Sequence, residues 1–141
     1  MITPTLSLIR SEDYFTKQFL KSISAEEVED GVSHPGEEVI ARAVLQYGES
    51  VVDAWCASIL VKSKSPHYGE EALKIVARAG FPRNSELRRS IVITALASRC
   101  IDFREAAVYA VEVWEDVSLC DLLRNHQDSV DWLMDYAQQV I

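Results

Sequence analysis

The chain has 141 residues, of which 48% are hydrophobic and 26% are charged, and its formal net charge is −8. These values are typical of one soluble globular domain whose core needs no metal or disulfide support. No apolar run approaches the ~20 residues of a membrane span, and the N-terminus lacks a basic segment followed by a long apolar stretch. We therefore expect a cytoplasmic protein with no membrane partner.

Helix-start signals recur along the chain. A small polar residue is followed three positions later by a carboxylate, just ahead of an apolar stripe. Such pairs are typical of helix N-termini, where they bind free N–H groups and match the helix dipole. The pairs are Ser24/Glu27, Ser50/Asp53, Asp102/Glu105, Ser118/Asp121 and Asp128/Asp131. The pattern predicts a train of separate, well-started helices.

In chain order, residues 1–10 predict an extended arm or a short first helix. A helix is predicted over 11–23, and an acidic, turn-rich stretch over 24–36 holds at most one helical turn. Pro35 opens the next helix, which Gly48 ends, and Ser50 starts another that runs to a loop over 62–66.

Pro66 lies in the first turn of the following helix, and Gly80 followed by Phe81 and Pro82 predicts its end. Asn84 or Ser85 caps the next helix, which is apolar on most faces and is therefore predicted to be central. Its run of β-branched residues also suits a strand, but the chain offers no second strand to pair with it. The last three helices are predicted to start at the Asp102, Ser118 and Asp128 signals.

Helix pairs recur about every 32–36 residues, near the period of helical-repeat proteins. Residues 101–141 resemble a HEAT-type repeat, in which an Asp-x-Arg start precedes an Ala-rich helix and an Asp-containing turn precedes a Leu-rich helix. The matching residues are Asp102, Arg104, Ala106, Ala107, Ala110, Asp116, Leu119, Leu122 and Leu123. The resemblance is strongest over 84–141, because 87–100 is similar to the second helix of a preceding unit.

That resemblance implies an all-α fold, namely a short right-handed α-solenoid of antiparallel helix pairs with about seven to eight helices. It also implies that Asp residues cap helices and that Arg and Asp form a ladder between units. We expect one domain over 1–141, in which 1–35 departs from the repeat pattern and forms an atypical N-terminal cap region.

The charges are unevenly placed along the chain. Acids outnumber bases by 10 to 4 over residues 1–60 and by 9 to 2 over 102–141, whereas bases outnumber acids by 8 to 3 over 61–101. One interpretation is internal, with neighbouring helices pairing opposite charges across their seams. The other is a basic patch for an anionic partner, flanked by acidic ends for a basic one.

The sequence contains no motif for catalysis, phosphate binding or metal binding. Neither CxxC, HExxH, GxSxG nor a Gly-rich loop occurs, and the carboxylate pairs fit helix first turns. The cysteines are predicted to be buried reduced thiols, and the histidines to lie at helix caps or on the surface. They are Cys56, Cys100, Cys120, His34, His67 and His126. We therefore predict no enzyme, no cofactor and no metal.

The HEAT resemblance implies a scaffold that binds another macromolecule. We predict a non-enzymatic adaptor, or a small inhibitor or immunity-type protein, whose acidic helical surface binds a basic protein. Helix-end tryptophans such as Trp114 and Trp132 are either packing residues or interface anchors. The predicted contact residues form one edge: Glu112, Trp114, Glu115, Asp116 and Asp121.

The sequence also leaves two alternative functions open. HEAT-like glycosylases acting on alkylated DNA bases use a basic concave surface, which the middle segment could supply through Lys74, Arg78, Arg83, Arg88 and Arg89. The net charge of −8 opposes phosphate binding, so nucleic acid is the less favoured partner. Some HEAT-type proteins act on phycobilin attachment, which gives a lyase-like, cofactor-handling protein as the second alternative.

Overall fold

The computed structural model describes residues 6–29, 31–62 and 66–141, and in this part the chain is all-α with no strand. The predicted fold class is confirmed at this level, with eight α-helices and one 3-10 helix among the described residues. They are α1 (Leu6–Ala25), α2 (Pro35–Tyr47), α3 (Glu49–Lys62), α4 (Pro66–Arg78), α5 (Ser85–Leu96), α6 (Ile101–Trp114), η1 (Val117–Leu119), α7 (Cys120–Asn125) and α8 (Asp131–Val140).

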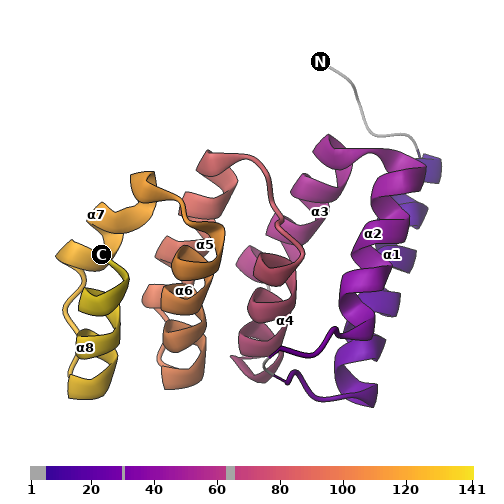
Figure 1. The fold of residues 1–141 in the computed structure, drawn as a ribbon. Helices are drawn as coiled ribbons and strands as arrows, with labels where there is room; N and C mark the ends of the chain where they lie inside the picture. Colours follow the sequence, from indigo (N-terminus) through magenta and orange to yellow (C-terminus); the bar gives the residue numbers. More distant parts are fainter. Residues whose placement is uncertain (1–5, 30, 63–65) are drawn as a thin grey trace.

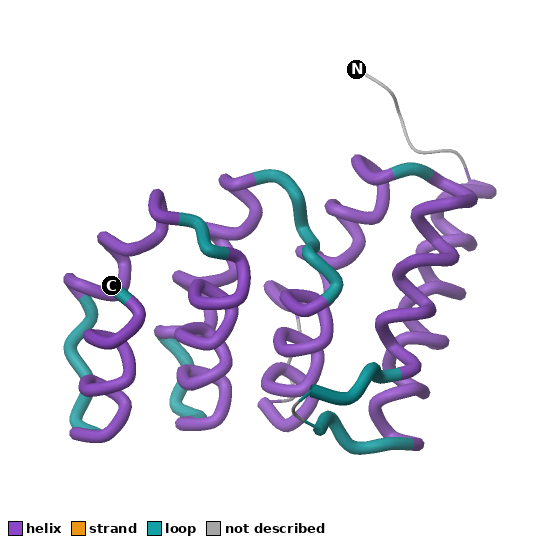
Figure 2. The backbone as a smooth tube through the Cα atoms, in the orientation of Figure 1, coloured by secondary structure: helices purple, strands orange, loops and turns teal. Residues whose placement is uncertain are grey.

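The helices stand side by side in a row, with α1 and α2 at one end and α7 and α8 at the other (Figure 1). Helix and loop follow one another along the described chain (Figure 2). The most extensive packing is between α4 and α6, followed by α5 with α6, α1 with α2 and α3 with α5. One continuous apolar cluster extends from Phe15 in α1 to Ala137 in α8, so the row shares a single core.

The first helix is longer than predicted. It begins at Leu6 and continues to Ala25, and the hydroxyl of Ser24 donates back to the carbonyl of Leu20 at 3.3 Å. Ser24 therefore belongs to the last turn of α1 and starts no helix. The predicted arm over 1–10 is helical from residue 6, and residues 1–5 lie outside the described part of the chain.

The predicted start of α2 at Pro35 is confirmed, and its N-cap residue is His34. Its Nδ1 accepts the N–H of Gly36 at 2.9 Å, and Glu37 Oε2 accepts the N–H of His34 at 2.7 Å, which forms a capping box. The Nε2–H of the same ring donates to the carbonyl of Glu26 at 2.7 Å, so His34 also fixes the α1–α2 loop. Histidine lies outside the usual set of capping residues, which is why the pattern did not find it.

The predicted helix end at Gly80 and the predicted helix start at Asn84 are confirmed. Gly80 has a φ of 80°, and the N–H of Phe81 donates to the carbonyl of Val76 at 3.0 Å, as in a Schellman motif. Asn84 then caps α5 by accepting the N–H of Leu87 at 3.0 Å. Local sequence therefore determines how α4 ends and α5 begins.

The Ser50/Asp53 pair, predicted to start a helix, does not cap α3. Ser50 lies inside α3, which begins at Glu49, and the carboxylate of Asp53 does not cap its own helix. It is 6% exposed and accepts the backbone N–H groups of Arg83 at 2.7 Å and Asn84 at 3.0 Å. Asp53 thus holds the α4–α5 loop against α3.

The prediction that the helix after Asn84 is central is wrong. Ile93 on α5 is 51% exposed, and the buried residues of that helix are Ile91, Val92 and Ala95. The more deeply buried helix is α6, which packs against α4, α5 and α8. Its buried side chains are Phe103, Ala106, Ala107, Val108, Ala110, Val111 and Trp114. Three of these are alanines, which leave room for neighbouring helices to approach.

We predict that Asp53→Ala lowers the free energy of unfolding by about 2–4 kcal/mol, because two part-buried backbone N–H groups lose their acceptor. Urea unfolding followed by circular dichroism measures this loss. The matched control is Asp13→Ala on the exposed side of α1, which should change stability little. Equal losses for the two variants would contradict the role assigned to Asp53.

Candidate functional site

The structure brings the two predicted sites together. The predicted acidic edge runs from the end of α6 to α7, and the predicted basic patch is spread over α4, the α4–α5 loop and α5. Arg88 lies 3.5 Å from Asp116, and Arg89 lies 2.6 Å from Asp121. Two residues of the predicted basic patch therefore form ion pairs with two residues of the predicted acidic edge.

Arg88 has structural partners on every side. Its Nε donates to the carbonyl of Pro82 at 2.6 Å, and its Nη2 to the carbonyl of Gly80 at 3.4 Å. The guanidinium also lies 5.0 Å from the ring centroid of Trp114 and 3.5 Å from Asp116. The side chain is 14% exposed, so it is not available to bind an external anion.

Asp116 begins η1 and joins it to α5. It accepts the N–H of Ser118 at 3.1 Å and the hydroxyl of Ser85 at 3.1 Å, in addition to its contact with Arg88. Hydrogen bonds from Ser118 lower the pKa of Asp116; burial opposes this, and Ser85 and Arg88 lower it further. The predicted cap at Ser118 is therefore wrong, because Asp116 performs that role.

The other basic residues are also largely engaged. Lys74 lies 3.2 Å from Glu70 and 3.7 Å from Glu105. Arg78 donates to the carbonyls of Glu29 and Val32 in the α1–α2 loop, and lies 3.6 Å from Glu37.

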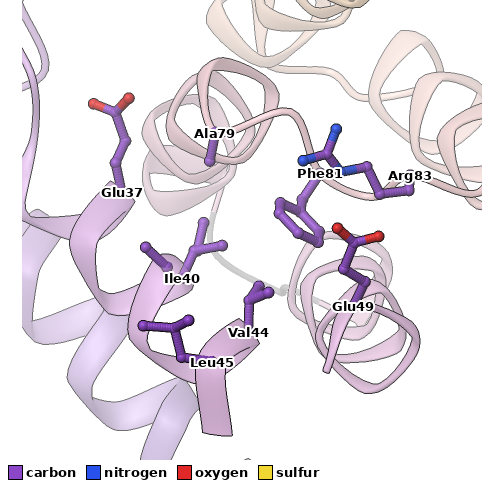
Figure 3. A pocket seen from close by; sticks show the side chains of 9 residues that line it. Glu37, Ile40, Val44, Leu45, Glu49, Ala79, Phe81 and Arg83 are labelled. Atoms are coloured by element: carbon purple, nitrogen blue, oxygen red, sulfur yellow. The ribbon is translucent and has the colours of Figure 1, made fainter. Parts of the chain in front are cut away.

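Arg83 differs from the other four, because it has no ion pair within the described part of the chain. It lies 4.9 Å from the ring centroid of Phe81, at the rim of a groove of about 420 Å³ (Figure 3). Ile40, Val44 and Leu45 of α2 form the apolar side of this groove, and Leu45 is 90% exposed.

Arg104 forms a second link of the same kind as Arg88. Both residues are in the fourth position of their helix, and Arg104 donates to the carbonyls of Ser98 and Arg99 at 3.1 Å each. It also donates twice to Asp128, from Nε at 2.8 Å and from Nη2 at 3.2 Å. Each arginine thus binds the loop before its own helix and an aspartate of a later loop.

Asp128 is the most enclosed of these carboxylates, with 1% of its side chain exposed. It accepts the Val130 N–H at 3.0 Å and lies 2.8 Å from His126 Nε2. Burial acts to raise the pKa of Asp128, but the bonds from Arg104, His126 and Val130 outweigh it and lower the pKa to about 2. Val130, rather than Asp128, is the N-cap residue of α8.

The remaining residues of the predicted edge have different surroundings. Trp114 is 8% exposed, and its Nε1 has no hydrogen-bond partner among the described residues, so this indole packs between helices. Glu115 ends α6 in the left-handed conformation with a φ of 52°. Glu112 is exposed and accepts the Tyr136 hydroxyl at 2.6 Å. Trp132, in contrast, is 51% exposed at the start of α8.

Polar side chains of α4, α6 and α8 lie near one another around Lys74 and Tyr136. We call this group the α4–α6–α8 acidic face, and it consists of Glu70, Lys74, Glu105, Tyr109, Glu112 and Tyr136. Lys74 Nζ lies 5.9 Å from the ring centroid of Tyr109 as well as beside two of the glutamates. Burial raises the pKa of Tyr136, and the nearby Glu112 and Glu105 raise it further. The only sequence signal was the helical spacing of Glu105, Tyr109 and Glu112.

The cysteines and histidines have packing and capping roles where they are described. Cys56 and Cys120 are buried, Cys100 is half-buried, and all three are free thiols. Burial, with the nearby Asp53, raises the pKa of the Cys56 thiol. The side chain of His67 lies outside the described part of the chain.

No family model, curated protein or solved structure matches this chain. Within the described residues, no group of three or more His, Cys, Asp or Glu side chains is arranged to hold a metal ion. None of the described helices combines the length and apolar character that crossing a membrane requires. The assignment of function therefore depends on the surfaces themselves.

We predict that Arg88→Met destabilises the protein by about 2 kcal/mol or more, because Asp116 and two loop carbonyls lose a charged donor. Arg89→Met should have a much smaller effect, since Arg89 and Asp121 are 41% and 45% exposed. Thermal and urea unfolding of the two variants measure the difference. A larger loss for Arg89→Met would contradict the internal role of Arg88.

Asp128 gives a prediction about pH. Its folded-state pKa of about 2 lies below the ordinary 3.8, so the ionised carboxylate stabilises the fold above pH ~4. This contribution, about 2 kcal/mol, is lost as the pH falls from about 4 through about 2. Urea unfolding from pH 6 to pH 2.5 should show a stability gap between parent and Asp128→Asn that narrows below pH 4. A stability difference between parent and Asp128→Asn that stays constant with pH would refute the prediction. The control is Asp13→Asn, which changes an exposed carboxylate in the same way.

Proposed function

We propose that this chain is a non-enzymatic helical-repeat scaffold that binds a basic protein through the α4–α6–α8 acidic face. The observation that carries the proposal is the internal use of the bases. Lys74, Arg78, Arg88 and Arg89 each lie within 2.6–3.7 Å of a carboxylate of this chain. These four bases are not available to a partner, and the chain as a whole has a net charge of −8.

The repeat architecture is supported by the recurring arginine links. Arg88 with Asp116 and Arg104 with Asp128 each join the first turn of one helix to the loop after the next helix, so each link connects neighbouring helices of the row. The row of helices in Figure 1, with described loops along its upper and lower edges in Figure 2, also fits a short right-handed solenoid of antiparallel pairs. Such a fold offers a rigid surface made of one helix from each unit.

The acidic face has the chemistry to bind lysine or arginine side chains. Glu70, Glu105 and the Tyr109 ring lie beside the Lys74 ammonium, and Glu112 with Tyr136 adds a third carboxylate to the face. The face therefore retains negative charge after Lys74 is counted. Lys74 lies between carboxylates and the Tyr109 ring, and we expect a partner cation to make contacts of the same kind on this face. The surrounding negative field would increase the association rate of a basic partner.

The nucleic-acid alternative has less support. A duplex-binding surface needs several accessible cations on one face, and four of the five candidates are already paired within the chain. Adaptor, inhibitor and immunity-type roles all fit the acidic face equally, because each needs a charged, rigid surface.

We predict that Glu105→Lys combined with Glu112→Lys abolishes capture of a basic protein from the source lysate at low salt. The change replaces two negative charges of the face by positive ones, which would repel a partner's cations. The matched control is Glu27→Lys combined with Glu86→Lys, which makes the same charge change at exposed positions elsewhere.

Mass spectrometry of the bound fractions at low and high salt, with protein and nucleic acid separated, provides the readout. The parent and the control should retain the same basic protein at low salt and lose it at high salt. Circular dichroism checks that each variant is folded. Retention by the Glu105/Glu112 variant, or recovery of nucleic acid in place of a protein, would refute the proposal.

A further inference from the structure

A groove between α1 and α2 lies at the N-terminal end of the helix row. Three adjoining hollows form it, and the largest has a volume of about 350 Å³. The hollows share lining residues such as Ser11, Tyr14 and Arg42, and all their lining residues belong to α1 or α2. We call this feature the α1–α2 groove.

The α1–α2 groove is basic although the surrounding sequence is acidic. Arg10, Lys21 and Arg42 line it, and Glu38 is the single acid among its described lining residues. The Arg42–Glu38 pair is 2.7 Å apart, but these side chains are 76% and 64% exposed, so water screens the pair and a partner could displace it. Tyr14, which is 67% exposed, adds an aromatic surface.

The opposite end of the row carries a complementary surface on α8. The exposed stripe of this helix consists of Asp131, Trp132, Asp135, Gln138 and Gln139 and contains no base. Trp132 is 51% exposed, and neither Asp131 nor Asp135 has an ion pair within the described part of the chain. The buried Leu133 and Ala137 face the core on the other side of α8. We call this feature the α8 stripe.

We propose that the α8 stripe of one copy of this chain docks into the α1–α2 groove of a second copy. Trp132 would enter the hollow beside Tyr14, where its indole meets an aromatic ring and the guanidinium of Arg42. Asp131 and Asp135 would face the cations that line the groove. Charge complementarity selects a second copy as the occupant, because every molecule carries both the basic groove and a stripe that has acids and no base.

This contact is head-to-tail. The helices that carry the two surfaces lie at opposite ends of the row (Figure 1). The interface joins two different surfaces, so it is heterologous and adds copies in a line instead of closing a dimer. One helix stripe in one groove is a small interface, so we expect weak association that depends on concentration and salt. The inference goes beyond the proposed function, because neither surface includes the α4–α6–α8 acidic face.

Two variants test the proposal. The groove variant, Lys21→Glu with Arg42→Glu, reverses the charge of the groove; the stripe variant, Trp132→Ala with Asp135→Ala, removes the indole and one carboxylate. Sedimentation velocity over a concentration series at low salt should show a rising mass for the parent. Each variant should associate at least tenfold more weakly than the parent, and high salt should reduce the association of the parent.

An equimolar mixture of the two variants gives the sharpest result. The intact stripe of the groove variant can bind the intact groove of the stripe variant, so the mixture should form 1:1 dimers and no larger species. A control variant, Lys62→Glu with Glu86→Ala, changes exposed charges outside both surfaces and should associate like the parent.

Three results would overturn the head-to-tail proposal. A parent that stays monomeric up to millimolar concentration would overturn the proposal, and so would variants that associate as the parent does. Binding of a separate acidic protein to the monomer, lost only in the groove variant, would show that the occupant is not a second copy. None of these outcomes affects the lysate capture by the acidic face, so the two proposals fail independently.

Discussion

The arrangement of helices depends on charged side chains that reach from one helix to the loop of another. Arg88 and Arg104 each bind carbonyls of the loop before their own helix and an aspartate further along the chain. Asp53 achieves a similar connection by accepting two N–H groups of the α4–α5 loop. Because these groups are largely buried, the loss of either partner leaves an uncompensated charge, which makes each link specific for one arrangement.

The same links explain why the charges are divided along the sequence. The bases of the middle segment face acids that lie before and after them in the chain, as with Arg78 and Glu37 or Arg88 and Asp116. A chain with a net charge of −8 therefore uses most of its middle cations internally and leaves acids on its exterior. The α1–α2 groove is a local exception, and both binding proposals follow from this distribution.

Sequence predicted those features that depend on neighbouring residues. The end of α4 at Gly80 and the cap of α5 at Asn84 were found, because turn and cap geometry involves residues a few positions apart. The uneven charges indicated long-range pairing but not the individual partners: Asp53 resembled a capping residue but binds a loop 30 residues away. The predicted acidic edge likewise included Asp116, whose partner Arg88 is 28 residues distant, so an internal link was interpreted as a binding site.

The central claim is that the arginine–aspartate links couple the helices energetically. A double-mutant cycle on Arg88→Met and Asp116→Asn, measured by urea unfolding, tests it most directly. We predict a coupling energy of about 1–3 kcal/mol, so that the double variant is more stable than the sum of the two single losses implies. Additive losses within about 0.5 kcal/mol would contradict the account, because they would mean that the two side chains stabilise the fold independently.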